Sequence, residues 1–137
     1  MYDAGPDPYC YEGSTVLKNI PGIRDAAQLE AFETVSTTQR ADEPLPIGRL
    51  SVRHFRSIHH HLFQDVYAWA GRYRVTRISK GDVTFCYPEN IPREMRRLFD
   101  SLKTQGFLRN LGLDEFAQRS AHFLAELNAI HAFREGN

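Results

Sequence analysis

The chain has 137 residues and a mass of 15.8 kDa, with 42% hydrophobic and 12% aromatic residues, enough apolar surface for one domain with its own core. Seventeen basic and seventeen acidic residues give a formal net charge of zero, so no global field favours nucleic acid or membrane partners. No apolar run approaches the roughly 18 residues of a membrane span, and no signal-peptide pattern opens the chain. Cys10 and Cys86 form no disulfide framework, so we expect two free thiols in a reducing cytosol. Since neither a membrane span nor a signal peptide is found, we expect a soluble protein made in the cytoplasm.

The first part of the chain predicts a loose start followed by a helix. Residues 1–8 are rich in Gly, Pro and Asp and are expected to form a flexible lead-in. A helix is expected from its cap, Asp25, to about Arg40, because residues recur on one side at helical spacing. The residues expected on that core-facing side are Leu29, Phe32, Val35 and Ser36. Two prolines within 43–48 then end the helix.

A second helix is expected over residues 52–63, with Ser51 as its cap. It carries three consecutive histidines at 59–61, which suggest a metal site. Consecutive residues on a helix point about 100° apart, so at most one or two of the three could share an ion. We therefore favour packing or surface roles for these histidines. The aromatic stretch at 62–74 predicts a core turn closed by Gly71 that serves as a scaffold.

A β-hairpin is predicted in the middle of the chain. Residues 74–79 and 83–87 are two β-favouring runs separated by Lys-Gly-Asp. A lone two-stranded hairpin is marginally stable unless it packs on another element. In an otherwise helical chain, the hairpin either covers part of the core or acts through its exposed edge. The residues alone leave both alternatives open.

Two further helices are expected in the second half of the chain. The first runs from about Pro92 to Thr104, since proline is tolerated at the first helical position. The second is capped by Asp114 and runs over about 115–129. Helical spacing predicts its core-facing residues to be Phe116, Ser120, Phe123, Leu124, Leu127 and Ile130. These elements together predict a mainly α fold, a helical bundle with one small β-hairpin.

The last eight residues combine groups that suit chemistry at a phosphate. His131 can accept a proton near neutral pH, because the ordinary pKa of imidazole is about 6.5. Glu135 offers carboxylate oxygens of the kind that magnesium binds alongside phosphates and water. Gly136 lets backbone N–H groups approach an anion closely, and Asn137 adds an amide donor. A base, a metal ligand and an anion cradle thus lie close together in the sequence.

Residues 131–137, His-Ala-Phe-Arg-Glu-Gly-Asn, resemble the start of the Fic family motif, His-Pro-Phe-x-(Asp/Glu)-Gly-Asn-Gly-Arg. Ala132 departs from the motif at the proline, and the closing Gly-Arg would follow Asn137. We therefore expect a Fic domain over residues 9–137 that is incomplete at its C-terminus. Tyr-x-Tyr-x-Gly-x-x-x-Leu-Lys-Asn-x-x-Gly-Ile near the N-terminus and the aromatic stretch at 62–74 are also similar to family signatures. All three occur in the family's order and resemble the bacterial type IV secreted effector and Fic toxin group.

The resemblance implies a protein adenylyltransferase of bacterial origin, a toxin or effector that transfers AMP from ATP to a Tyr, Thr or Ser hydroxyl of a target protein. ATP is the implied substrate and Mg²⁺ the implied metal. His131 is the implied catalytic base, Glu135 the implied metal ligand, and Phe133 the implied anchor of the motif loop. The residues expected to contact the nucleotide are Gly136, Asn137, Lys80 and Thr84. In the family, the hairpin is a flap that pairs with the target's main chain, so the target is expected to dock on 74–87.

Two other functions stay open at this level. The related Doc branch transfers the terminal phosphate, although its motif has bulkier residues at the position of Gly136. A Fic-like fold could also be a binding module without turnover, and this 137-residue chain could itself be inactive. Fic enzymes are typically restrained by a helix with the pattern Ser/Thr-x-x-x-Glu-Gly/Asn, which residues 1–137 lack. We expect a separate antitoxin-like protein to carry it, the alternative being sequence after Asn137. The site of action is either the bacterial cytoplasm or, after translocation, a host or recipient cell.

Overall fold

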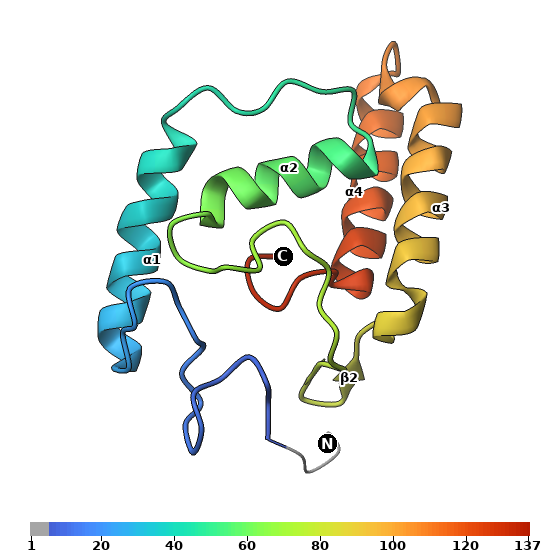
Figure 1. Cartoon of the computed structure of the whole chain (residues 1–137). Helices are drawn as coiled ribbons and strands as arrows, with labels where there is room; N and C mark the ends of the chain where they lie inside the picture. Colours follow the sequence, from blue (N-terminus) through green and yellow to red (C-terminus); the bar gives the residue numbers. More distant parts are fainter. Residues whose placement is uncertain (1–5) are drawn as a thin grey trace. The chain divides into compact units, whose positions relative to one another are not determined.

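The computed structural model describes residues 6–137, so the first five residues of the expected lead-in lie outside the described residues. The described part is mainly helical, with one two-stranded antiparallel sheet, which confirms the predicted fold class (Figure 1). The chain divides into two compact units. They are unit 1 (up to Gly48, Arg53–Arg72 and Gly136) and unit 2 (Arg49–Val52, Tyr73–Glu135 and Asn137).

Both cysteines lie outside any disulfide within the described residues, as the sequence predicts. Cys10 is buried and Cys86 is partly buried. Across residues 6–137, none of the helices has the length and apolar character that spanning a bilayer requires.

The first helix of unit 1, α1 (Ala26–Ala41), begins where the sequence predicts. The Asp25 side chain accepts a hydrogen bond of 2.9 Å from the backbone N–H of Gln28. This bond satisfies one of the donors that the first turn of a helix leaves unpaired. The helix boundary is therefore encoded locally.

The buried side of α1 is narrower than predicted. Leu29 and Ser36 are buried, but Val35 is 57% exposed, so its predicted core position is wrong. Neighbouring residues on a helix point about 100° apart. A stripe that buries Leu29 and Ser36, which are seven residues apart, therefore leaves Val35 to one side.

The core of unit 1 forms around the aromatic turn that follows α2 (Val52–Phe63). The Tyr67 and Trp69 rings stack with their centroids 4.5 Å apart. An isolated β-bridge pairs Cys10 with Leu17, which brings the N-terminal segment into the same core. The buried members of this core are Cys10, Leu17, Leu29, Phe63, Val66, Tyr67 and Ala70. The aromatic turn is therefore part of the scaffold, as predicted.

The three histidines of α2 serve packing and backbone contacts. His59 is 4% exposed, its Nδ1 accepts a 2.9 Å hydrogen bond from the Gly71 backbone N–H, and its ring stacks on Phe63. Ring nitrogens of His60 and His61 lie within hydrogen-bonding distance of backbone carbonyl oxygens. Within residues 6–137, no three or more His, Cys, Asp or Glu side chains are grouped to hold a metal ion. The contacts of His59 agree with a packing role and the exposure of His60 with a surface role, the two roles predicted for these histidines.

Gly71 provides a stability test of the turn. Its φ is +80°, and an added Cβ would lie 2.8 Å from the His60 Cβ and 2.9 Å from the Arg56 carbonyl oxygen. We expect Gly71→Ala to lower the free energy of unfolding by about 2–4 kcal/mol, because left-handed strain and overpacking add. Gly13→Ala is the matched control, since its φ is +71° with no atom within 4 Å of the added Cβ. Denaturant unfolding of both variants should show the larger loss at Gly71, and equal losses would contradict the packing argument.

Unit 2 is built on two helices, α3 (Ile91–Thr104) and α4 (Leu113–Ile130), which run side by side in opposite directions (Figure 1). α3 begins one residue before the predicted start, and Pro92 lies in its first turn. Phe99 on α3 and Phe123 on α4 meet edge to face with ring centroids 5.5 Å apart. The buried residues of α3 are Ile91, Met95, Phe99 and Leu102. The C-terminal motif begins directly after α4, the second helix of this pair.

α4 differs from the prediction at its start and on its apolar face. Its N-cap is Gly112, and Asp114 lies in the first turn, where a carboxylate is favoured by the positive end of the helix dipole. Phe116 is 47% and Leu124 is 61% exposed, so their predicted core positions are wrong, whereas Ile130 is buried. Within unit 2, α3 and the 3-10 helix Gly106–Leu108 contact α4, and these neighbours leave Phe116 and Leu124 uncovered.

The hairpin is shorter than predicted. β1 (Ser79–Lys80) pairs with β2 (Val83–Thr84) in antiparallel register, Ser79 opposite Thr84 and Lys80 opposite Val83. The backbone N–H of Phe85 adds a 3.1 Å hydrogen bond to the Ile78 carbonyl. The longer strands expected over 74–79 and 83–87 do not form.

The segments on either side of the two strands make hydrogen bonds outside the sheet. The carbonyl oxygens of Thr76 and Cys86 accept hydrogen bonds from the Arg74 side chain, and the Cys86 N–H donates to the Ala129 carbonyl. These contacts satisfy the flanking backbone groups without further strand pairing. The strands stop at two residues each.

Candidate active site

The motif loop begins with a left-handed residue at the end of α4. His131 is the C-cap, with φ 50° and ψ 62°, and its N–H donates a 3.1 Å hydrogen bond to the Leu127 carbonyl. A non-glycine residue in this region costs roughly 1–3 kcal/mol, and such residues cluster at functional sites. The predicted base thus stands at the turn where the helix becomes the loop.

The loop after His131 is closed by its own side chains. Phe133 is fully buried, as expected for an anchor, and its ring lies 6.2 Å from that of Tyr73. The Asn137 side chain accepts a 2.7 Å hydrogen bond from the Phe133 N–H and donates one of 2.7 Å to the Phe133 carbonyl. Asn137 therefore stabilises the conformation of the loop, a role that the sequence did not predict. A second hydrogen remains on its amide nitrogen.

The His131 ring lies against an aromatic residue of the hairpin segment. The rings of Phe85 and His131 stack with centroids 4.0 Å apart and planes 11° apart. Phe85 directly follows β2 and is 9% exposed. One face of the imidazole is thereby covered by the segment that the Fic resemblance identifies as the flap.

The surroundings of His131 favour its neutral form. Burial lowers the pKa of His131, and the charges of Arg74 and Arg134 lower it further, whereas Glu135 and the Asn128 backbone act in the opposite direction. The Nδ1 atom is buried and makes no hydrogen bond of ordinary geometry. Nε2 is therefore the ring nitrogen that can accept a proton from a substrate.

A buried guanidinium ties the motif loop to the hairpin segment. Arg74 is 2% exposed, and its backbone N–H donates a 2.9 Å hydrogen bond to the Ala132 carbonyl. Its side chain donates to four carbonyl oxygens, those of Ile130 (3.1 Å), His131 (2.6 Å), Thr76 (2.7 Å) and Cys86 (2.5 Å). Two of these carbonyls belong to the negative end of α4, which favours a cation.

The remaining predicted site residues lie on the hairpin and near the end of the motif loop. Glu135 is exposed, and Lys80 and Thr84 are exposed on the two strands of the hairpin. Gly136 has φ +76°, and within unit 1 an added Cβ would lie 2.4 Å from the Phe63 ring. A left-handed glycine with no room for a side chain fits the close backbone approach predicted for an anion cradle.

The donor set fits magnesium that is bound jointly with a nucleotide. Glu135 supplies one exposed carboxylate, and the described residues contain no cluster of three candidate ligands. Magnesium is usually held by one or two carboxylates together with phosphates and water, and rarely by a closed protein cage. A single accessible carboxylate beside the predicted anion cradle meets that requirement.

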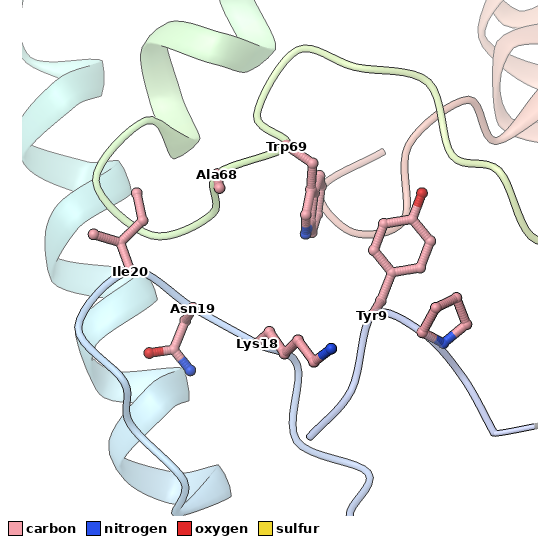
Figure 2. A pocket seen from close by; sticks show the side chains of 7 residues that line it. Tyr9, Lys18, Asn19, Ile20, Ala68 and Trp69 are labelled. Atoms are coloured by element: carbon pink, nitrogen blue, oxygen red, sulfur yellow. The ribbon is translucent and has the colours of Figure 1, made fainter. Parts of the chain in front are cut away.

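Unit 1 also contains a cavity of about 250 Å³ that is separate in the sequence from the motif. Figure 2 shows Trp69 and Tyr9 on one side of it and Ile20 and Asn19 on the other. The full lining is Pro8, Tyr9, Lys18, Asn19, Ile20, Ala68 and Trp69. None of the predicted site residues belongs to this lining.

Sequence reasoning missed two residues of the site, Arg74 and Phe85. Arg72, Arg74 and Arg77 look alike in the sequence, but only Arg74 is buried among them. Likewise, Phe85 is buried whereas its neighbour Thr84 is exposed. No local pattern distinguishes these residues, because their partners lie about 50 residues away in the motif loop.

The comparisons with known proteins assign the family. A model of the Fic/DOC family matches residues 49–137. This chain belongs to the Fic/DOC family. A relative from Sinorhizobium fredii, named "Probable protein adenylyltransferase y4lH", is 49% identical over 137 residues, which cover 99% of this chain and 71% of the relative.

Two solved Fic structures share the fold. One is the N-terminal Fic domain of a VirB-translocated Bep effector protein of Bartonella quintana with bound ADP, at a TM-score of 0.81 and 29% identity. The match covers 93% of this chain and 68% of that domain. The other is BepC, a VirB-translocated effector protein of Bartonella tribocorum with bound AMPPNP, at a TM-score of 0.81 and 28% identity. The match covers 93% of this chain and 70% of that protein.

Proposed function

We propose that this chain is a protein adenylyltransferase, which transfers AMP from ATP to a hydroxyl side chain of a target protein. The observation that carries the proposal is the motif loop of a Fic/DOC chain, in which His131, whose pKa is lowered by burial, lies four residues before the exposed carboxylate of Glu135. The rhizobial relative named as an adenylyltransferase supports the reaction. The Bartonella domains with bound ADP and AMPPNP support the nucleotide.

In the proposed reaction, His131 acts as the general base. Its Nε2 takes the proton from a target Tyr, Thr or Ser hydroxyl as the hydroxyl oxygen attacks the α-phosphorus of ATP. The new bond joins that oxygen to the α-phosphorus. The bond from the α-phosphorus to the bridging oxygen of the β-phosphate breaks, and pyrophosphate leaves with the electron pair. The proton remains on the imidazolium until solvent removes it.

The rest of the loop would hold the phosphates in place for this attack. Glu135 would hold Mg²⁺, which supplies charge neutralisation across the phosphates when it is bound. Gly136 would offer its backbone N–H to the phosphate oxygens, and the second amide hydrogen of Asn137 would donate to the same oxygens. Phe133, which is fully buried, would anchor this segment. Donors fixed before the reaction stabilise developing charge without reorganising.

The target protein is proposed to dock on the hairpin over residues 74–87. β1 and β2 form an isolated two-stranded sheet within the described residues, and Lys80 and Thr84 are exposed on it. An exposed strand edge can bind an extended peptide through main-chain hydrogen bonds, which holds a hydroxyl side chain without reading its sequence. Lys80 and Thr84 are the proposed contacts to nucleotide or target on this element.

We further propose how the chain is restrained and where it acts. The absence of Ser/Thr-x-x-x-Glu-Gly/Asn from residues 1–137 supports restraint by a separate antitoxin-like protein that carries this helix. The two solved relatives are both VirB-translocated effector proteins, which supports action in a recipient cell after translocation. Co-purification with a small helical partner from the native operon would support the first of these, and a lone monodisperse chain would count against it.

The test of the reaction uses ATP labelled at either the α- or the γ-phosphate. The 137-residue chain, and the same chain extended through the Gly-Arg of the family motif, are incubated with magnesium and a cell lysate. Label on protein from the α position only is the expected result. Label from the γ position only would indicate phosphate transfer of the Doc type. No label from either version, with ATP still bound, would leave a binding module without turnover.

The pH dependence provides a second test of His131. Because burial and the charges of Arg74 and Arg134 lower the pKa of this histidine, its neutral form persists below the ordinary value of about 6.5. We therefore expect the acid limb of kcat/KM, which reports on the free enzyme, to have its midpoint below about 6.5. An NMR titration of the ligand-free chain against a peptide of residues 127–137 checks the direction. A midpoint above that of the peptide would contradict it.

A further inference from the structure

One guanidinium connects the two segments that the proposed reaction must bring together. The Arg74 side chain donates to the carbonyl oxygens of Ile130 and His131 at the start of the motif loop. It also donates to the carbonyls of Thr76 and Cys86, which lie before and after the hairpin strands. All four bonds come from one rigid planar group that is 2% exposed.

The hairpin side of this connection continues to the catalytic histidine. The Cys86 N–H donates a 3.2 Å hydrogen bond to the Ala129 carbonyl, and the Cys86 carbonyl accepts from Arg74. Both backbone groups of Cys86 are therefore held in place. Its neighbour Phe85 stacks on the His131 ring at 4.0 Å, so the position of that stack follows from the position of Cys86.

We propose that Arg74 is the positioning residue that sets the flap and His131 in one arrangement for transfer, an inference that rests on the proposed function. Arg74 touches neither nucleotide nor target in this account and acts through the backbone of its four partners. It fixes the left-handed turn at His131 from one side and the segment after β2 that contains Phe85 and Cys86 from the other.

The chemistry of arginine makes the role specific. Its donors form a fixed fork that can serve several carbonyl oxygens at once, whereas a lysine ammonium is a compact point charge with three donors. Lysine at position 74 keeps the charge beside the end of α4 but cannot reproduce the fork. Buried carbonyls without donors are costly, so the loop and the flap are expected to separate or to exchange partners.

NMR spectroscopy of the full chain tests the role of Arg74 without nucleotide. The Phe85 ring current shifts the carbon-bound His131 ring protons upfield, and Phe85→Leu gives the reference without the stack. We expect Arg74→Lys and Arg74→Gln to move these resonances toward the Phe85→Leu values. We also expect the Cys86 amide to exchange about 10- to 100-fold faster, because the Cys86 carbonyl loses its charge-assisted hydrogen bond from Arg74. The amides of α3 should keep their protection. Arg72→Lys, an exposed arginine two residues away, is the matched control and should change neither reading.

The outcomes separate this inference from the proposed function. Unchanged His131 shifts and unchanged Cys86 exchange in Arg74→Lys would overturn the positioning role, even if AMP transfer occurs. Changed readings together with a lysate assay that gives no AMP transfer in any version would retain the positioning role and reject the function. With both intact, Arg74→Lys should lower kcat while leaving KM for ATP within about twofold, the pattern of lost transition-state interactions.

The Phe85→Leu variant decides the case if both Arg74 variants unfold. It removes the stack but leaves the four bonds of Arg74 in place. We then expect the Cys86 amide of Phe85→Leu to exchange within about threefold of the wild-type rate. A tenfold or greater increase would mean that the stack, and not Arg74, holds the segment after β2, which would overturn the inference.

Discussion

Replacing His131 by alanine is expected to lower the rate of AMP transfer by about 10²- to 10⁴-fold, the usual contribution of a general base. His131 is the residue at the turn from α4 into the motif loop, and its neutral form is favoured by burial and by the charge of Arg74. Because alanine also loses the contact with Phe85, His131→Asn is the sharper variant. Asparagine tolerates the left-handed backbone and cannot act as a base.

The two variants should therefore be inactive for the same reason while nucleotide binding is retained. Initial rates with α-labelled ATP and equilibrium binding of AMPPNP measure the two properties separately. Either variant within a few fold of the wild-type rate would reject His131 as the base. Loss of AMPPNP binding in both variants would instead indicate that His131 shapes the nucleotide site.

Glu135→Gln is expected to have the second large effect, a fall in kcat/KM of about a hundredfold with a higher magnesium requirement. The amide keeps the size of the side chain but loses the charge that attracts a hard cation. Glu135 is exposed next to the left-handed Gly136, so the substitution should not disturb packing. The rate is measured as a function of magnesium concentration at saturating ATP.

Glu126→Gln is the matched control, since Glu126 is an exposed carboxylate on α4 outside the motif loop. Its magnesium dependence should equal that of the wild type. A Glu135→Gln variant with an unchanged magnesium dependence would reject Glu135 as the ligand. A fall in rate that high magnesium restores would support it, because mass action compensates for a weakened site.

Local signals predicted the helices well because the causes of a helix boundary are close in sequence. The cap of α1 is a bond between Asp25 and Gln28, three residues apart. Pro92 lies in the first turn of α3, where proline costs least. The motif residues were found for the same reason, since their chemistry is concentrated between His131 and Asn137.

Burial was harder to predict because it depends on neighbours from elsewhere in the chain. The spacing on α4 predicted core positions for Phe116 and Leu124, but both are exposed. A hydrophobic period identifies an apolar face without identifying what covers it. Val35 on α1 is a second example. Its position fits the helical spacing of apolar residues, but its side chain is exposed.

The candidate site was incomplete in the sequence because its supports are distant from the motif. Arg74 reaches the Ile130 and His131 carbonyls, 56 and 57 residues further along the chain. The same guanidinium donates to the Cys86 carbonyl, which lies beyond the end of β2. The proposed nucleotide contacts of Lys80 and Thr84 and the antitoxin-like partner remain predictions.

Mass spectrometry of a modified target tests the central claim most directly. A labelled protein from the lysate is purified after incubation with ATP, magnesium and the active chain, and its adduct is located by fragmentation, with pyrophosphate measured in parallel. We predict one AMP attached to a Tyr, Thr or Ser oxygen for each pyrophosphate released, and no adduct with His131→Asn. A phosphate adduct with ADP release, or an AMP adduct that persists undiminished in His131→Asn, would contradict the account.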